Sequence, residues 1–230
     1  MLAAVALAIG LGAALVRSVA PDNAVDLVAP LPRNGVVAAD KNAPERGGPW
    51  LVTSGTLLTR DGQLWSGEPD AGPPDSAGRT GSAVLRAVSV RRDFQDVRVR
   101  VSLRMIALSS SHRTPLRPWD GVHVFLRYLD QDHLYSVDLQ RRDGLVTIKR
   151  KAMTYTTLAE TKLPGDHRWH SYEVGVTDLA GGTHLVLWVD DRRVLDVADR
   201  GSSALRGPGR VGLRGDNAEF WVRQFQVVPR

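Results

Sequence analysis

GVHVFLRYLDQDHLYSVDL, residues 121–139, alternates apolar and polar side chains on both sides of an aspartate-rich turn. Alternation with period two predicts two half-buried strands, and the turn predicts that they form a hairpin. If Tyr128 pairs with His133, the cross-strand pairs of the apolar face are Leu126–Tyr135, Val124–Val137 and Val122–Leu139. The other face then carries His123, Phe125 and Arg127 opposite Asp138, Ser136 and Leu134. A slip of one residue would bury the polar set, so the pattern indicates which face is core.

The next turn, Asp143-Gly144, is a two-residue hairpin signal, and it predicts a third strand at residues 145–151. This turn would place Asp138 opposite Lys149 and keep Val146 and Ile148 on the apolar side. Three consecutive strands therefore agree on one core face and one polar face.

Period-2 segments separated by turn residues continue through residues 50–230, and no segment of helical length shows a 3.6-residue period. The other predicted strands are 83–90, 97–108, 171–177, 184–189, 193–197, 211–214 and 219–228, with short edge strands at 56–59 and 63–66. Many short strands with proline and glycine between them predict an all-β fold, a two-sheet antiparallel jelly-roll sandwich.

The hairpin at residues 121–139 resembles the central hairpin of laminin G-like and concanavalin A-like sandwiches. In that hairpin an FR strand, an Asp/Asn-rich turn and a Y-x-V-x-L strand follow one another. Further matching pieces, in the family's order, are WHSYEVGV (169–176), LWVDDRRVLD (187–196), GRVGLR (209–214) and FWVRQFQV (220–227). Over residues 50–228 the chain is thus similar to the concanavalin A-like lectin/glucanase superfamily. The resemblance implies the fold, but it does not choose among sugar-binding modules, 3-keto-disaccharide hydrolases and adhesion domains.

The first twenty residues contain an uncharged apolar run, Leu2–Val16. It is shorter than the about 20 residues of a membrane-spanning helix and suits the central region of a signal peptide. No Lys or Arg precedes the run, and Pro21 follows the small residues at which cleavage is expected. We expect residues 1–20 to form a hydrophobic helix, either a signal peptide or a membrane anchor, that delivers the domain to the extracellular side or the cell envelope. Residues 21–48 contain four prolines and three glycines and are predicted to be a linker, followed by one domain at 49–230.

Composition excludes several classes of function. The 230 residues include no cysteine, which removes disulfides, thiolate zinc sites and thiol catalysis. The net charge is +5, but the arginines are scattered among acids without a basic helix or recognition motif, so no nucleic acid is expected as a partner. We expect a monomer that contacts a membrane only through its N-terminal segment.

The candidate ligand-binding residues are Trp119, His123, Arg127, Asp138 and Lys149. A row of donors and acceptors on a sheet face suits sugar hydroxyls, and an aromatic ring at the strand entrance suits a pyranose face. The alternative is that the charged residues only stabilise neighbouring strands, by a few tenths of a kcal/mol per pair. The polar loop at 109–120 is predicted to arch over this face, because long loops in compact domains are often functional.

The tryptophans differ in their place in the pattern. Trp65 and Trp119 lie beside loops and are expected to be exposed, whereas Trp169, Trp188 and Trp221 lie within strand signatures and are expected in the core.

Catalytic residues remain unknown from the sequence. None of the five glutamates has the Glu-x-Asp-x-x-Glu spacing of family 16 glycosidases, so that chemistry is not expected. The histidines lack zinc spacing, and the aspartate turns lack the spacing of a calcium loop, so no metal or cofactor is predicted; the resemblance leaves structural calcium open. The predicted function is extracellular carbohydrate binding or surface interaction with a polysaccharide or glycan. The alternatives are an exported 3-keto-disaccharide hydrolase-like enzyme, using Asp and His on the sheet face, and a protein-binding adhesion domain.

Overall fold

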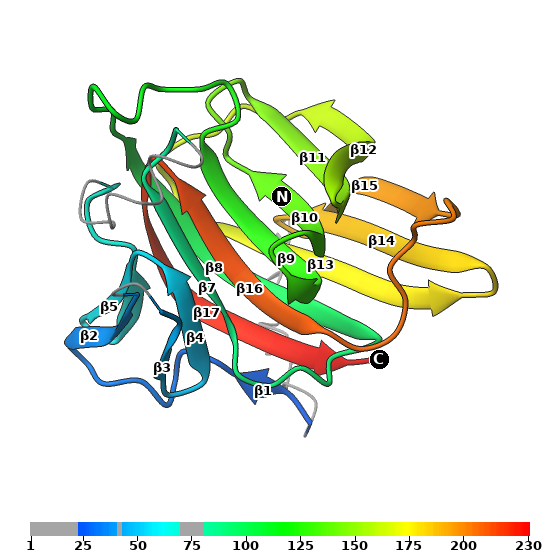
Figure 1. The fold of residues 1–230 in the computed structure, drawn as a ribbon, viewed down its shortest axis with the longest axis horizontal. Helices are drawn as coiled ribbons and strands as arrows, with labels where there is room; N and C mark the ends of the chain where they lie inside the picture. The colour runs from blue at the N-terminus through cyan, green and yellow to red at the C-terminus, as the bar shows by residue number, and fades with distance from the viewer. Residues whose placement is uncertain (1–22, 41–42, 70–80) are drawn as a thin grey trace, which may run out of the picture.

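The computed structural model describes residues 23–40, 43–69 and 81–230. These residues form 17 strands in two antiparallel sheets that pack face to face (Figure 1). The hydrophobic helix expected at residues 1–20 lies outside the described residues. In the part of the chain that is described, no helix is both long and apolar enough to cross a membrane.

The nine-stranded sheet has the strand order β15 (Arg192–Asp199), β14 (Gly182–Val189), β13 (His170–Leu179), β8 (Val97–Leu108), β17 (Ala218–Pro229), β6 (Gln63–Trp65), β5 (Thr56–Arg60) and β2 (Gly35–Ala39), and β1 (Val25–Asp26) also pairs with β17. The eight-stranded sheet has the order β12 (Thr154–Lys162), β11 (Leu145–Ala152), β10 (His133–Leu139), β9 (Gly121–Asp130), β16 (Arg210–Asp216), β7 (Val84–Ser89), β4 (Trp50–Ser54) and β3 (Glu45–Gly47). This is the predicted jelly-roll sandwich. The outer face of each sheet is defined as the face that points away from the other sheet.

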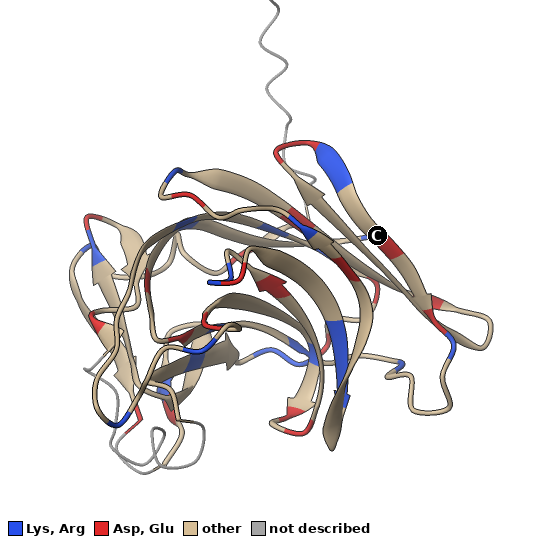
Figure 2. Cartoon of the chain, turned by 90° about the horizontal axis from the view of Figure 1, so that it is seen from above, with Lys and Arg blue, Asp and Glu red and all other residues tan. Residues whose placement is uncertain are grey.

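One core lies between the sheets. Alternate residues of β8, such as Val99 and Val101, and of β9, such as Val122 and Val124, are fully buried in it. Alternation with period two sends their neighbours to the outer faces. Charged residues of both signs are interspersed over the sheets and loops, as the scattered arginines predicted (Figure 2).

The expected linker at residues 21–48 instead contributes strands to both sheets. β1 pairs with β17, β2 with β5, and β3 with β4. Leu27 is buried beside them, and its carbonyl oxygen accepts a hydrogen bond of 2.8 Å from the indole Nε1 of Trp50. The prediction of a linker failed because these strands are only two to five residues long, too short to show a period.

The register of the central hairpin is confirmed for five cross-strand pairs, from Tyr135–Leu126 to Leu139–Val122. The pairing of Tyr128 with His133 is wrong, because His133 lies opposite Asp130 and the register shifts between His133 and Tyr135. Between Leu126 and Asp130, β9 contains two more residues than the facing part of β10, and Arg127 in this stretch has a φ of 46°. A β-bulge of this kind turns the side chains that come after it to the opposite face.

The turn after β10 is also longer than predicted. β10 ends at Leu139 and β11 begins at Leu145, so Asp138 lies opposite Thr147, and Lys149 lies opposite Ser136. A shift by two residues keeps every side chain on its predicted face, which is why Val146 and Ile148 are still in the core.

Candidate functional site

A cavity of about 400 Å³ lies on the outer face of the eight-stranded sheet. Its lining residues come from five strands and two connecting segments, and they are Trp119, His123, Asp138, Arg141, Lys149, Tyr155, Arg214 and Asp216. We call it the His123 cavity. His123, Asp138 and Lys149 face it because each alternates with a core residue of β9, β10 or β11.

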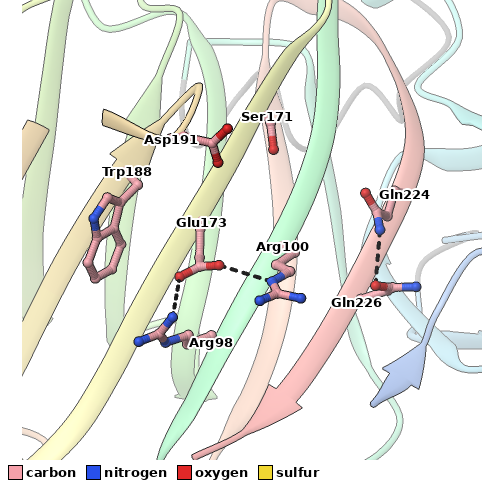
Figure 3. A pocket seen from close by; sticks show the side chains of 8 residues that line it. All are labelled: Arg98, Arg100, Ser171, Glu173, Trp188, Asp191, Gln224 and Gln226. Carbon is pink, nitrogen blue, oxygen red and sulfur yellow. Dashed lines mark hydrogen bonds and ion pairs between the residues drawn. The ribbon is translucent and has the colours of Figure 1, made fainter. Parts of the chain in front are cut away.

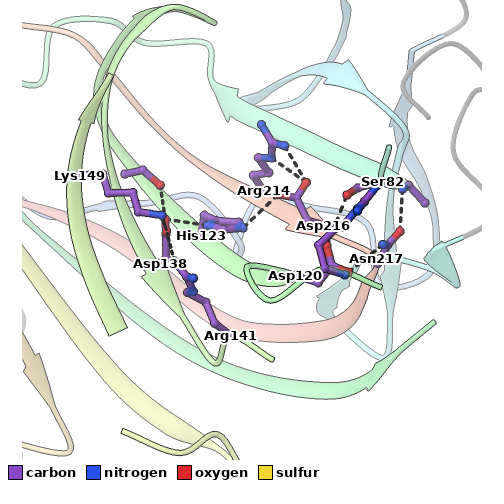
Figure 4. Close-up of polar contacts among 12 residues, drawn as sticks. Ser82, Asp120, His123, Asp138, Arg141, Lys149, Arg214, Asp216 and Asn217 are labelled. Atoms are coloured by element: carbon purple, nitrogen blue, oxygen red, sulfur yellow. Dashed lines mark hydrogen bonds and ion pairs between the residues drawn. The ribbon is translucent and has the colours of Figure 1, made fainter. Parts of the chain in front are cut away.

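His123 lies between two carboxylates at the floor of this cavity (Figure 4). Its Nδ1 is 2.7 Å from Oδ1 of Asp138, and its Nε2 forms an ion pair at 3.2 Å with Oδ2 of Asp216, without hydrogen-bond geometry. Burial by itself would lower the pKa of His123, but the charges and contacts of Asp138 and Asp216 outweigh it and raise the pKa to about 9. His123 is therefore an imidazolium at neutral pH.

Asp138 is a buried carboxylate that accepts from several donors at once. Its donors are His123, Ser136 at 2.6 Å, Thr147 at 2.9 Å, Lys149 at 2.7 Å and Arg141 at 3.3 Å. Burial raises the pKa of Asp138, yet the charges and hydrogen bonds of His123 and Lys149 hold it well below the ordinary value. The carboxylate stays ionised, and these donors use its full capacity as a hydrogen-bond acceptor.

Asp216 is held in the same way on the other side of His123. Two nitrogens of Arg214 lie 2.8 Å from its Oδ1. Burial opposes ionisation, but Arg214 and His123 bring the pKa of Asp216 down to about 2. The floor is therefore a fixed pattern of alternating charges.

The loop at residues 109–120 supplies one wall of the cavity through Trp119, as predicted. The loop is anchored by the fully buried Asp120 and Asn217 (Figure 4). Asn217 Nδ2 donates to Oδ2 of Asp120 at 2.9 Å, and its Oδ1 accepts from the Ala83 amide at 2.8 Å. Trp119 is 43% exposed and lies on the cavity lining, as does Tyr155 of β12, which is 48% exposed.

Arg127 is not part of this cavity. The bulge turns it toward the other sheet, where its Nη1 donates to Oδ1 of Asp178 at 2.6 Å, to Thr183 at 3.0 Å and to the Leu205 carbonyl at 2.7 Å. The same bulge brings Tyr128 to the outer face, where its ring stacks on Phe125 with centroids 5.8 Å apart. Arg127 therefore connects the two sheets, and the structure brings together the other four predicted residues without it.

Four lining residues were not predicted from the sequence: Arg141, Tyr155, Arg214 and Asp216. Arg214 and Asp216 alternate with core residues of β16, so a pairing of β16 with β9 would have placed them beside His123. Tyr155 lies on β12, a mostly exposed strand with little apolar alternation.

Among the tryptophan predictions only that for Trp119 is confirmed, because this residue is exposed. Trp65 was expected to be exposed and is half-buried instead. Trp169, Trp188 and Trp221 are also half-buried rather than in the core. All three belong to the nine-stranded sheet or its border. In the described ranges there is no group of three His, Cys, Asp or Glu side chains that could hold a metal ion.

The fold is that of concanavalin A-like and galectin-like jelly-roll sandwiches. The carbohydrate-binding module CBM66 from Bacillus subtilis matches with a TM-score of 0.56 and 15% identity, over 77% of this chain and 94% of that one. The exoplasmic/lumenal domain of VIP36, bound to Ca²⁺ and Man3GlcNAc, matches with a TM-score of 0.52 and 10% identity, over 80% of this chain and 84% of that one. The metal-free carbohydrate recognition domain of Emp46p matches with a TM-score of 0.53 and 11% identity, over 86% and 94%.

These identities are low, so the likeness concerns the fold alone. No protein-family model matches the sequence. A search of curated proteins gives no significant match either.

Proposed function

We propose that this chain is a lectin-like carbohydrate-binding domain that acts outside the cytoplasm, and that the His123 cavity is its sugar site. The observation that carries the proposal is the lining itself, in which two exposed aromatic rings, Trp119 and Tyr155, accompany a floor of fixed charged groups. Aromatic rings suit the apolar face of a pyranose, and fixed polar groups give orientation. The similar sugar-binding modules and lectin domains support the same class of ligand.

Lys149 and Arg214 are the hydrogen-bond donors that we assign to sugar hydroxyls. Each lies on the lining and uses only part of its donor capacity on an aspartate, Lys149 on Asp138 and Arg214 on Asp216. The aspartates orient these cations, because each carboxylate is held by several contacts of its own. Extracellular or envelope location rests on the apolar N-terminal run and belongs to the same proposal.

An exported glycoside-processing hydrolase is the second candidate, because His123 lies between two aspartates. The charge states argue against it. A glycosidase needs one carboxyl group that is protonated near neutral pH as the general acid. Here both carboxylates have lowered pKa values, and the imidazolium between them is buried.

A glycan array probed with the full chain tests the sugar site. Trp119→Ala and Tyr155→Ala should each reduce binding at least tenfold, and Leu129→Ala, another exposed apolar residue that does not line the cavity, should keep it. Arg127 and Asp138 are unsuitable for this test because both are buried in ion pairs. Equal binding by all four proteins would refute the assignment of the site.

The pH profile separates the two candidates. His123 and the two aspartates do not titrate between about pH 4 and about pH 8, so sugar binding should be constant over that range. A bell-shaped rate of product formation from an array hit would instead support the hydrolase.

A further inference from the structure

The outer face of the nine-stranded sheet carries an unusual set of half-buried tryptophans. Trp188 lies on β14, Trp221 on β17 and Trp65 on β6, and Trp169 directly precedes β13. Large aromatic side chains outside a core are enriched where proteins bind partners. This face lies on the opposite side of the sandwich from the His123 cavity.

Arginines cover three of these four tryptophans. Arg98 lies over Trp188 with its guanidinium carbon 5.5 Å from the ring centroid, and Arg60 lies over Trp65 at 5.8 Å. Arg104 and Arg223 both contact Trp169, at 5.6 and 4.7 Å. A guanidinium group held on an aromatic ring keeps its donor edge free and oriented.

The arginines at Trp169 have no acid to balance them. Among the described residues neither Arg104 nor Arg223 forms an ion pair, Arg223 donates only to Ser102, and the buried Nε of Arg104 has no hydrogen-bond partner. Two like charges on one ring repel each other, and within the fold this repulsion is opposed by the cation-π contacts with Trp169 and the hydrogen bond to Ser102. A bound anion would remove the repulsion.

An open trough of about 620 Å³ lies on the same face (Figure 3). Arg98 and Arg100 share Glu173 in its middle, both at 2.9 Å, Trp188 lies at one side, and Gln224 and Gln226 lie at the other. Asp191 is also on the lining, so the trough alone is close to neutral. The excess positive charge of this face therefore comes from residues outside the trough lining: Arg104 on β8 and Arg223 on β17, both at Trp169, and Arg230, whose guanidinium lies beside Gly175.

We propose that this face binds an acidic polysaccharide. The carboxylate or sulfate groups would pair with Arg104 and Arg223, and the chain of sugars would continue along the trough, where glutamines and Ser171 suit hydroxyls. An open, polar, elongated surface fits a polymer with charges at intervals. A protein partner would require a closed apolar centre, and the middle of this face is an ion pair.

Affinity electrophoresis of the full chain through gels that contain polygalacturonate tests the proposal. The fully methyl-esterified polymer has the same backbone without charge and is the matched probe. The wild type should be retarded by polygalacturonate and not by the ester, and the retardation should weaken from about 0.1 M to about 1 M NaCl. Arg104→Gln/Arg223→Gln should reduce the affinity at least tenfold.

The control variant is Arg92→Gln/Arg200→Gln, which removes two exposed charges that contact no tryptophan. It should be retarded like the wild type, as should Trp119→Ala, because the His123 cavity is a separate site. Equal losses in both double variants would show that only net charge matters, and this would overturn the proposal. Absence of retardation of the wild type would also overturn it and favour a protein partner, and stronger retardation by single-stranded DNA would overturn the choice of polymer.

Discussion

Raising the pH from 7 to 9 should destabilise the fold by roughly 2 kcal/mol through His123 alone. The pKa of this buried histidine is about 9 in the folded chain, against about 6.5 when unfolded. A group whose pKa is higher in the folded state stabilises the fold below its unfolded pKa, and this contribution is lost as the pH rises through the folded pKa. At about 1.4 kcal/mol per pKa unit, the contribution is roughly 2.5 kcal/mol at pH 7 and below about 0.5 kcal/mol at pH 9.

The two buried phenols do not titrate in this window, but one other histidine does. Burial raises the pKa of Tyr135 to about 12 and raises that of Tyr172 as well, so both phenols remain neutral up to pH 9. His170, between Asp190 and Asp166, also has a raised pKa despite its burial, and its titration would overlap with that of His123. Comparison with a His123 variant cancels the part due to His170.

Urea unfolding followed by tryptophan fluorescence at pH 7, 8 and 9 measures the effect. The wild type should lose roughly 2 kcal/mol more than His123→Gln over this range. His112→Gln, at an exposed histidine, should keep the wild-type slope. If the wild type and His123→Gln have the same slope, or if NMR shows His123 titrating near its ordinary pKa, the assignment of a charged imidazolium is refuted.

Three further substitutions test other parts of the structure by urea unfolding. Arg127→Met should cost about 3 to 5 kcal/mol, because it leaves Asp178 without its buried cation. Leu27→Ala should cost about 3 kcal/mol, as expected of a core residue, and an effect near zero would show that the stretch before Trp50 is a linker after all. Asn217→Gly, which keeps the backbone φ of 49° accessible, should cost about 2 kcal/mol through the lost bond to Asp120 and should also weaken glycan binding, because the loop that holds Trp119 loses its anchor. Unchanged glycan binding in that variant would show that the bond between Asn217 and Asp120 is not needed to position Trp119 at the cavity.

The hairpin at residues 121–139 was predictable because its alternation is strong and both strands bury one face. Pairs such as Val124–Val137 follow from that pattern alone. The side chains of the third strand lie on the predicted faces even though the turn before it is longer than predicted. The reason is that the predicted register is wrong by two residues and not by one. Prediction of faces is thus more robust than prediction of pairs.

The bulge at Arg127 was not predictable from local sequence. A charged residue in an outward position gives no sign that the backbone will take a φ of 46° there. The cause is tertiary: Asp178, Thr183 and the Leu205 carbonyl all come from distant segments and together satisfy the guanidinium. Gly209 also takes part, since a Cβ there would lie 2.6 Å from the Cα of Arg127.

The tryptophans of the nine-stranded sheet show a different limit. Residue type and a place in strand signatures predicted Trp169, Trp188 and Trp221 in the core. On β14 and β17, however, Trp188 and Trp221 occupy outward-facing positions of the alternation, next to buried residues such as Leu187 and Val222. The alternation would have placed them outside, and here it is a better guide than residue type.

The His123 cavity shows why the candidate site was found while its chemistry stayed open. Alternation placed His123, Asp138 and Lys149 on one face, and opposite charges on neighbouring strands fit either sheet stabilisation or a ligand site. The structure adds Asp216 and Arg214 from a strand distant in sequence, and these decide the charge states. The pKa of His123 is raised and the pKa values of both aspartates are lowered. All three pKa values therefore lie away from neutral pH, where His123 is protonated and both aspartates are ionised. General acid or base catalysis instead needs a group whose pKa lies near the working pH, so that it can gain or lose a proton. A floor that cannot change its charge suits a site that holds a ligand in one orientation, and this is the physical reason to prefer binding over hydrolysis.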